Sequence, residues 1–482
     1  MALSPLSVDV AVIGAGTAGL AAYRAARAQG QRCVLIESGP YGTTCARVGC
    51  MPSKLLIAAS EAAHMLQAAP AFGVHPGSVR IDGAAVMARV RSERDRFVGF
   101  VLDAVAQIPD ADKLHGHARF TGPHTLQAGE HTALTAARVV IATGSRPNRL
   151  AALAPAGARA IVSDQVFDWT GLPASVAVIG SGVIGLELGQ ALARLGVRVS
   201  IFARGASLAQ LTDPLVLQAA AKALGTELDL RFQTEVVDAQ PDPAGVVLTT
   251  RDAQGGTRSE HFETVLMAGG RTPNLDQLGL EHSGLELDAA GIPCFDPCTM
   301  QCGNSHIFIA GDADAERPLL PEAADQGKIA GDNAGRYPDV RPGLRRTPLA
   351  IAFCEPQIAT VGASYRALCG AGGHKFAVGM VSFENQGRSR VMLQHRGLLR
   401  VYAEYGSGRF LGAELAGPRA EHLAHLLAWA CQARLTVAQM LDMPYFHPVV
   451  EEGVRTALRD LEAKLERGAP HSEDATDCTP GR

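Results

Sequence analysis

Two cysteines lie close together in the segment GTTCARVGCMPSK, residues 42–54. Thiols at this spacing can bind a metal, act as a catalytic dithiol, or be two unrelated buried side chains. A structural disulfide is not expected, because cytosolic thiols are kept reduced and the N-terminus MALSPLSVDVAVIG lacks the charged region of a signal peptide. Three interpretations of Cys45 and Cys50 therefore stay open at this point.

Composition limits the class of protein. The chain has 482 residues, of which 47% are hydrophobic and 19% charged, as in a soluble globular protein. With 44 basic and 48 acidic residues its net charge is −4, which argues against nucleic acid or an anionic membrane as the main partner. The sequence contains no apolar run of about 18 residues. We therefore expect no membrane span and a cytoplasmic location.

The other cysteines show no metal-binding pattern. Cys294, Cys298 and Cys302 form a cluster, but their spacing fits no common zinc or iron–sulfur motif. We predict no metal site. The dispersed cysteines are interpreted as small buried hydrophobic residues, and Cys478, in the polar C-terminal tail, as incidental.

The chain carries one phrase twice, at residues 8–38 and 174–204, aligned without a gap at an offset of 166 residues (174 minus 8). Each copy opens with an apolar strand, turns on glycines, continues with helical periodicity and closes with a second strand. This is the context that a dinucleotide-binding fingerprint requires, with the phosphates at the helix N-terminus. The fingerprint glycines are Gly14, Gly16 and Gly19 in the first unit and Gly180, Gly182 and Gly185 in the second.

The two units differ where the second strand ends. Glu37 closes the first unit, and a carboxylate there accepts hydrogen bonds from a ribose with free hydroxyls, as in FAD or NAD. The matching position in the second unit is Ala203, followed by Arg204. An arginine beside a missing acid favours a 2′-phosphate, so NADP becomes possible. The alternative is that Arg204 is a solvated surface residue.

Further glycine turns follow buried strands. IATGSRPN (141–148) and MAGGRTPN (267–274) each end an apolar strand beside a dinucleotide unit. IFIAGDAD (307–314) is a buried strand that ends at Asp312. We expect this carboxylate to hold a sugar-alcohol hydroxyl, to cap the following helix, or both.

The segment after Cys50 predicts a helix that starts near Pro52. Cys50 at its N-terminus would have its thiolate stabilised by the helix dipole. Lys54, one turn into the helix, adds a positive charge. Two dinucleotide sites combined with a dithiol indicate an electron relay from sulfur to a nicotinamide, with a flavin between them.

These motifs resemble the flavoprotein pyridine nucleotide-disulfide oxidoreductases over residues 8–465. The two cysteines with MPSK, both glycine fingerprints, ATG, GD and the C-terminal HPVVEEG (447–453) occur in family order. The resemblance implies that Cys45 is the interchange thiol and that Cys50 faces the flavin. It also implies an ion pair of Lys54 with Glu187 near the flavin ring.

The resemblance implies a catalytic base as well. His447 matches that base and Glu452 the carboxylate that orients it, which suits a thiol that attacks only as thiolate. In the family this histidine comes from the other subunit, so an obligate homodimer is expected. The remaining cofactor-binding residues expected on this basis are Thr44, Ala118, Thr143, Gly144 and Gly311 for FAD, and Val236, Gly270 and Arg271 for NAD or NADP.

The expected fold is α/β, with two Rossmann-type dinucleotide-binding domains and a C-terminal α+β dimerisation domain. Residues 1–150 and 276–345 form the FAD-binding domain, with a helical insert at 53–110. Residues 151–275 form the NAD(P)-binding domain, 346–467 the dimerisation domain, and 468–482 a disordered tail.

Within the family, SK after the proline of the thiol motif, ENQGRSRVMLQHRGLLRVYAE (384–404) and LGAELAGPRAEHL (411–423) look more like dihydrolipoyl dehydrogenases than glutathione reductases. Dihydrolipoyl dehydrogenases use FAD to pass electrons from a dihydrolipoyl group to NAD+. Two features depart from that pattern: Ala203 replaces the usual acid, and Pro321 replaces a usual histidine. The lipoyl group, free or on a separate protein, is the expected partner. The alternatives are an NADPH-dependent reductase of another small disulfide, similar to glutathione reductase, and a catalytically silent flavoprotein subunit. Mercuric reductases carry paired C-terminal cysteines, whereas this tail has Cys478 alone.

Overall fold

The structure is a computed structural model that describes residues 4–370 and 375–468. The expected disordered tail, with Cys478, lies outside the described residues from 469 onward. Within the described ranges, no helix combines the length and apolar character needed to cross a bilayer.

The first domain is built on a seven-stranded sheet in the order β3-β2-β1-β6-β5-β4, with β17 paired to β6. β1 pairs parallel with β2 and β6, and β17 joins from a segment that follows the whole second domain. The chain therefore leaves the first sheet and returns to it. The strands are β1 (Ser4–Ile13), β2 (Cys33–Glu37), β3 (Lys113–His115), β4 (Ala118–Gly122), β5 (Thr125–Ala128), β6 (Thr132–Ile141) and β17 (Ile307–Ile309).

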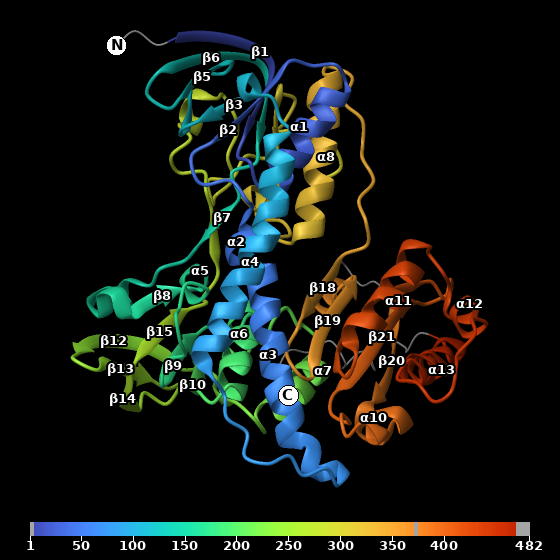
Figure 1. Ribbon diagram of the computed structural model, residues 1–482. Helices are drawn as coiled ribbons and strands as arrows, with labels where there is room; N and C mark the ends of the chain where they lie inside the picture. The colour runs from blue at the N-terminus through green and yellow to red at the C-terminus, as the bar shows by residue number, and fades with distance from the viewer. Residues whose placement is uncertain (1–3, 371–374, 469–482) are drawn as a thin grey trace.

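Two helices pack closely beside this sheet, α1 (Thr17–Ala28) and α8 (Leu320–Arg336), as Figure 1 shows. Small residues allow the close approach. A Cβ added at Gly331 would lie 2.2 Å from the carbonyl oxygen of Ala22. Backbone-to-backbone packing of this kind fixes α8, and with it the end of β17, against the first dinucleotide unit.

The second domain repeats the pattern with a five-stranded parallel sheet in the order β11-β10-β9-β15-β8. A separate antiparallel sheet, β12-β13-β14, lies beside it, and β7 pairs with β16 where the chain crosses between the first two domains (Figure 1). The elements are β7 (Ser145–Pro147), β8 (Ala160–Val162), β9 (Ser175–Ile179), α6 (Val183–Arg194), β10 (Arg198–Phe202), α7 (Pro214–Leu224), β11 (Asp229–Arg231), β12 (Glu235–Asp242), β13 (Gly245–Arg251), β14 (Thr257–Phe262), β15 (Thr264–Met267) and β16 (Arg271–Pro273).

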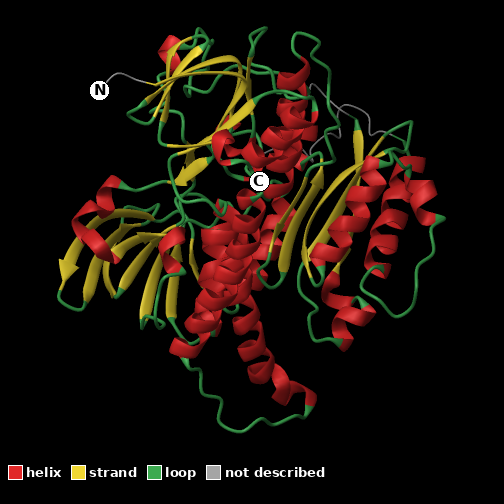
Figure 2. Ribbon diagram, turned by 45° about the horizontal axis from the view of Figure 1, so that its top comes forward, coloured by secondary structure: helices red, strands yellow, loops and turns green. Residues whose placement is uncertain are grey.

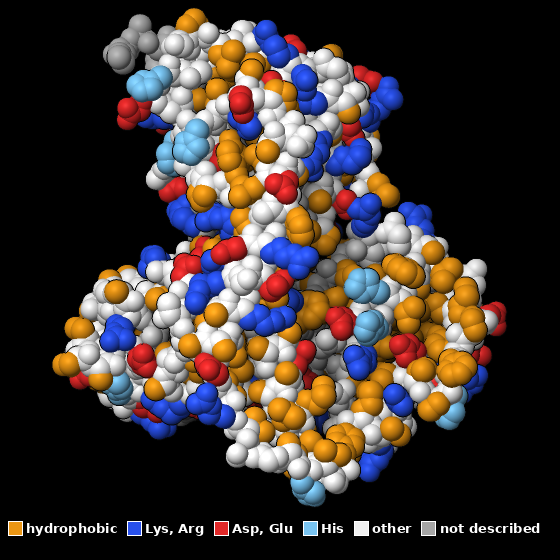
Figure 3. Space-filling model, viewed as in Figure 1, with side chains coloured by type: hydrophobic (Ala, Val, Ile, Leu, Met, Phe, Trp, Pro, Cys, Tyr) orange, Lys and Arg blue, Asp and Glu red, His pale blue; other side chains and the backbone are white. Residues whose placement is uncertain are grey.

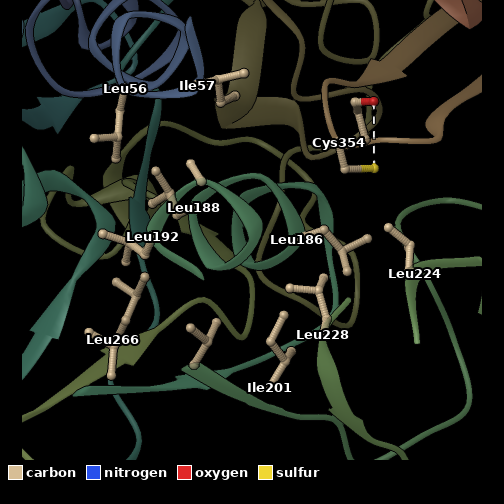
Figure 4. Close-up of a cluster of buried hydrophobic side chains, with 14 of the residues drawn as sticks. Leu56, Ile57, Leu186, Leu188, Leu192, Ile201, Leu224, Leu228, Leu266 and Cys354 are labelled. Atoms are coloured by element: carbon tan, nitrogen blue, oxygen red, sulfur yellow. Dashed lines mark hydrogen bonds between the residues drawn. The ribbon is translucent and has the colours of Figure 1, made fainter. Parts of the chain in front are cut away.

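A long helix links the domains. α3 (Cys50–Ala68) runs antiparallel to α4 (Gly83–Ala106) and packs on α6 of the second domain. Figure 4 shows Leu56 and Ile57 of α3 facing Leu188 and Leu192 of α6 in one buried cluster. The helix begins at Cys50, two residues before the predicted start. Apolar packing therefore joins the thiol segment directly to the second domain.

The C-terminal domain has an antiparallel sheet in the order β18-β19-β22-β21-β20 with helices packed on it (Figure 2). Its core is a cluster of its own that includes Leu399, Val401, Leu423 and Leu458. The predicted fold class is confirmed. The elements are β18 (Leu349–Ala352), β19 (Gln357–Gly362), α9 (Tyr365–Gly370), β20 (Phe376–Ser382), α10 (Gly387–Val391), β21 (Leu398–Glu404), β22 (Phe410–Gly417), α11 (Ala420–Gln432), α12 (Val437–Leu441) and α13 (Glu452–Glu466).

Candidate active site

The two thiols lie on consecutive helices and contact each other. Cys45 belongs to the short helix α2 (Thr44–Val48) and Cys50 opens α3. Gly49 lets the chain turn between them, since a Cβ there would lie 3.0 Å from the Thr44 carbonyl oxygen. The structure describes both cysteines as thiols, and a hydrogen bond joins their side chains. This contact brings the predicted dithiol together.

The contact separates the acidities of the two thiols. The hydrogen bond from Cys45 and the charge of Lys54 together outweigh the cost of burial and lower the pKa of Cys50 to about 7. The same hydrogen bond, together with burial, raises the pKa of Cys45. One thiol is therefore poised as a thiolate near neutral pH while the other keeps its proton.

Lys54 forms the predicted ion pair with Glu187. Its Nζ lies 2.7 Å from Oε2 of Glu187, which is buried on α6. The other carboxylate oxygen accepts the backbone N–H of Phe353 at 2.9 Å. Three segments that are distant in sequence, α3, α6 and the loop after β18, therefore meet at this pair. A buried carboxylate with one cation and one N–H donor has the partners that burial requires.

A cleft of about 510 Å³ opens at the first dinucleotide unit. This volume is in the range of small-molecule sites. Among the residues predicted for FAD, those that line the cleft are Gly14, Gly16, Glu37, Thr44, Ala118, Thr143 and Gly144.

The cleft has the features that a dinucleotide requires. A Cβ added at Gly16 would meet no atom of the described residues within 4 Å, so the backbone is open to a pyrophosphate. The Thr143 hydroxyl is buried and has no partner among the described residues. Glu37 already accepts the N–H of Ala15 at 2.8 Å and of Gly39 at 2.7 Å, and it keeps free lone pairs for ribose hydroxyls. These residues fit FAD.

Gly311 and Asp312 lie beside this cleft at the end of β17. The Ser145 hydroxyl donates to Asp312 at 2.7 Å, and the N–H of Gly311 donates to Gln326. The expectation that Asp312 caps the following helix is wrong. α8 begins only at Leu320, and a short 3₁₀ turn over residues 311–314 intervenes. The expectation that Asp312 holds a sugar hydroxyl stays a prediction.

The second unit reproduces the same backbone. A Cβ at Gly180 would lie 2.5 Å from the Ala268 carbonyl oxygen, and one at Gly185 would lie 2.0 Å from that of Gly180. Gly182 has open space beside it within the described chain. Ala203 is buried, and Arg204, the next residue, is exposed.

Three other residues predicted for the nicotinamide nucleotide have protein partners here. Arg271 donates to the Ser145 hydroxyl at 2.8 Å and to its carbonyl at 2.7 Å, across the β7–β16 pair. Gly270 precedes it with a positive φ of 105°. Val236 lies on β12 and packs partly buried against the core of the second domain. Their role in nucleotide binding stays a prediction.

His447 and Glu452 form a dyad at the start of α13. Nδ1 of His447 lies 3.1 Å from both carboxylate oxygens, and the N–H of Val449 also donates to Glu452. The hydrogen bond with His447 lowers the pKa of Glu452. The imidazole is 81% exposed. Figure 1 shows α13 at the outer edge of the C-terminal domain, away from α2, so the described chain does not bring the dyad to its own thiols.

The comparisons with known proteins agree with this geometry. The pyridine nucleotide-disulphide oxidoreductase family matches residues 8–327, and its dimerisation domain matches residues 349–458. The chain belongs to this family. It is therefore an FAD-dependent flavoprotein with NAD(P)H as electron partner.

Several relatives cover nearly the whole chain. Mercuric reductase of Shigella flexneri is 32% identical over 96% of this chain and 82% of its own. Mycothione reductase of Mycobacterium tuberculosis (strain H37Rv) is 29% identical over 94% and 99%. Dihydrolipoyl dehydrogenase of Haloferax volcanii is 29% identical over 93% and 95%. The crystal structure of LpdA from Mycobacterium tuberculosis aligns with a TM-score of 0.79 at 26% identity, over 94% of this chain and 99% of its own.

The dimerisation domain of the family supports a homodimer. Hydrophobic side chains gather on the C-terminal domain in Figure 3. Two large residues of this domain are strongly exposed: Trp429 is 70% exposed and Phe446, next to His447, is 78% exposed. An apolar surface of this kind marks an interaction face.

Sequence reasoning missed Phe353, which contacts both Lys54 and Glu187. It lies in an apolar stretch, LAIAFCEP, that reads as an ordinary buried strand. No spacing in the sequence connects it to the thiols, because the contact exists only after the C-terminal domain packs on α6. The family phrases alone could not have identified it.

Proposed function

We propose that the chain is a dihydrolipoyl dehydrogenase. It oxidises a dihydrolipoyl group to the cyclic disulfide and passes two electrons to NAD(P)+. The observation that carries this proposal is the pair of contacting thiols with separated acidities, placed beside Lys54 and Glu187. A dithiol substrate needs a partner disulfide to accept its electrons and a stabilised thiolate to retain them.

Cys45, Cys50 and Lys54 have different roles in the proposed thiol–disulfide exchange. In the oxidised enzyme Cys45 and Cys50 form a disulfide. A substrate thiolate attacks Cys45 and releases Cys50 as thiolate, and the second substrate thiolate then displaces Cys45 and closes the substrate disulfide. Lys54 stabilises the released Cys50 thiolate. Bound FAD supplies the electron path from this thiol pair to the nicotinamide.

The partner subunit's His447 accepts the substrate thiol protons in this proposal. Glu452 orients the imidazole through Nδ1, which leaves Nε2 for the substrate. The exposed position of the dyad in a single chain supports a site shared between subunits.

A second candidate is an NAD(P)H-driven reductase of another small disulfide. The observation that favours it is buried Ala203, with exposed Arg204 beside it, where an NAD-type unit carries an acid. The similarity to mycothione reductase and mercuric reductase also fits reduction as the working direction. A silent flavoprotein subunit is a weaker proposal, because it has no need for an intact set of Cys45, Cys50, His447 and Glu452.

One assay separates these candidates. The purified holoenzyme is offered NAD(H) and NADP(H) with dihydrolipoamide, lipoamide, glutathione disulfide, mycothione and mercuric ion. We expect the highest kcat/KM with the dihydrolipoyl substrate. A larger kcat/KM for another acceptor with NADPH would replace the proposed substrate, and inactivity with all of them would support the silent subunit.

The role of His447 is tested by substitution. His447→Ala is expected to lower dithiol turnover by on the order of 10²–10⁴, the usual contribution of a positioned acid–base group. The flavin should stay bound, because the dyad lies far from the cleft. Activity within about a factor of two of wild type would remove His447 from the mechanism.

Mixed dimers test the sharing of the site. Cys45→Ser and His447→Ala homodimers are each expected to be nearly inactive, whereas a heterodimer contains one intact site and should recover activity. The matched control mixes Cys45→Ser with Cys50→Ser, which leaves no intact thiol pair. Absence of recovery in proven Cys45→Ser/His447→Ala heterodimers would place the site within one chain.

A further inference from the structure

Phe353 contacts both members of the Lys54–Glu187 pair. Its backbone N–H donates to Oε1 of Glu187 at 2.9 Å, and its ring lies under Lys54 with Nζ 4.6 Å from the ring centroid. An ammonium within about 6 Å of an aromatic centroid is attracted to the ring face. The side chain of Lys54 is 35% exposed, so without the ring its flexible stem has open space into which it can move.

The segment that carries Phe353 is fixed to α6. Oε1 of Gln190 accepts the N–H of Glu355 at 2.7 Å, and Nε2 donates to the carbonyl of the same residue at 2.8 Å. Arg194 donates to the Glu355 carboxylate at 2.8 Å. Glu187, Gln190 and Arg194 follow one another at i, i+3 and i+7, so they share one face of α6, and all three are buried.

We propose that Phe353 is a positioning residue that aims the Lys54 ammonium at Cys50, and that Gln190 holds Phe353 in place for this purpose. The inference rests on the proposed function in one respect, namely that Cys50 works as a thiolate. Phe353 reaches Cys50 only through Lys54, and it acts through its ring on one side and its backbone on the other.

The groups that act on Cys50 come from three elements. The Cys45 thiol on α2 and Lys54 on α3 favour the thiolate, and Glu187 on α6 opposes it. Coulomb interactions weaken with distance and with exposure to water. If Lys54 moves outward, its stabilisation of the Cys50 thiolate falls, while the unfavourable effect of the Glu187 charge remains. Loss of the ring should therefore move the titration of Cys50 upward.

Alkylation measures this titration directly. Trypsin cleaves after Arg47 and Lys54, so the peptide VGCMPSK, residues 48–54, carries Cys50 as its single cysteine. Reduced holoenzyme is treated briefly with iodoacetamide across a range of pH, and mass spectrometry of this peptide gives the midpoint. We expect a wild-type midpoint near 7, as the pKa of Cys50 indicates.

Phe353→Leu removes the ring and keeps the N–H to Glu187. It should raise the midpoint by at least about half a pH unit, which is roughly a threefold loss of thiolate below the midpoint. Phe353→Tyr, the matched control, keeps the ring and should stay within about 0.2 units. Lys54→Met should give a larger rise, and Phe353→Leu added to it should give no further rise, because the ring acts through the missing ammonium.

Every other outcome contradicts either this inference or the proposed function. An unchanged midpoint in folded, flavin-containing Phe353→Leu would overturn the proposal, and so would an equal rise in the Lys54→Met background. If Phe353→Leu does not fold, Gln190→Leu decides, since it should raise the midpoint in the same direction by a smaller amount, and no rise would overturn the proposal. A wild-type midpoint near 9 would instead contradict the proposed function itself.

Discussion

The two dinucleotide units share a backbone and differ in the side chains that it carries. In both, the first glycine has a positive φ, 103° at Gly14 and 121° at Gly180, and faces a carbonyl oxygen of a neighbouring strand end. The third glycine of each lies against the carbonyl of the first. The shared phrase therefore specifies a phosphate-binding turn and nothing about which nucleotide is bound or what lies next to it.

The helices that follow these turns show the difference. α1 meets α8 through alanines and glycines, so the two backbones touch. α6 carries Glu187, Gln190 and Arg194 on the face that meets the C-terminal domain. The position of Glu187 corresponds to Ala21 in the first unit. One unit is thus adapted for close packing and the other for polar contacts between domains.

Replacing the first glycine of each unit in turn is the strongest test of this comparison. A Cβ at Gly14 would lie 2.2 Å from the Ala142 carbonyl oxygen, and one at Gly180 would lie 2.5 Å from that of Ala268. Strain of about 1–3 kcal/mol per site corresponds to roughly 5- to 150-fold in affinity. Gly14→Ala should therefore lose bound FAD, whereas Gly180→Ala should keep the yellow flavin and raise KM for the nicotinamide.

The measurement is flavin absorbance per protein after gel filtration, together with KM for NAD(H) and NADP(H). Gly30→Ala is a suitable control, because φ there is also positive, at 79°, while a Cβ meets open space outside both sites. Loss of flavin from Gly180→Ala as readily as from Gly14→Ala would show that the two sites have been assigned to the wrong cofactors or depend on each other.

Local patterns made most of the fold predictable. Strand, glycine turn and helix are encoded within about 30 residues of one another, and the repeat showed that this occurs twice. The buried strand in IFIAGDAD (307–314) predicts a return of the chain to the first domain, and the structure shows that this strand, β17, pairs with β6. The sequence predicts the start of α3 two residues late, near Pro52, because Cys50 and Met51 give no start signal. The capping role of Asp312 was wrong because a 3₁₀ turn after Gly311 delays α8.

The candidate site was predictable only where residues are close in sequence or belong to a known phrase. Cys45, Cys50 and Lys54 lie within one short segment, and the pairing of His447 with Glu452 spans five positions. The contact of Phe353 with Lys54 joins positions about 300 residues apart and depends on how three domains pack. No periodicity records such a contact, so the structure was needed to find it.

A smaller effect is expected from changing the two residues that follow β10, the second strand of the second unit. Ala203→Glu with Arg204→Ala gives the second unit the carboxylate that the first has at Glu37. The new acid accepts ribose hydroxyls and repels a 2′-phosphate, and removal of the arginine loses a charge-assisted contact worth roughly 1.5–3 kcal/mol. We expect kcat/KM to move toward NAD(H) by at least about tenfold.

Thermal stability of the double variant is the control, since Ala203 is buried. Arg204→Ala alone should weaken NADP(H) binding and leave NAD(H) kinetics unchanged. A wild-type enzyme that prefers NAD(H) by about a thousandfold, with no effect of Arg204→Ala, would leave Arg204 as a surface residue without a role in binding.

The smallest effect concerns the thiol that follows the first unit and has no counterpart after the second. The pKa of Cys50, about 7, lies below that of an ordinary thiol, because of the hydrogen bond from Cys45 and the charge of Lys54. A lowered pKa means that the thiolate is present above about pH 7 and is lost as the pH falls through that value.

Between pH 7 and pH 6 the thiolate fraction of Cys50 falls from about one half to about one tenth, roughly fivefold. The long-wavelength absorbance that a thiolate produces against the flavin in the two-electron-reduced enzyme should fall by the same factor and be missing in Cys50→Ser. Cys45→Ala removes the hydrogen-bond donor that is the largest cause of the lowered pKa of Cys50, and it should shift the midpoint upward. Absorbance that stays constant down to about pH 5, or that persists at full strength in Cys50→Ser, would show that another group faces the flavin, and the asymmetry between the two units would then not extend to the sulfur chemistry.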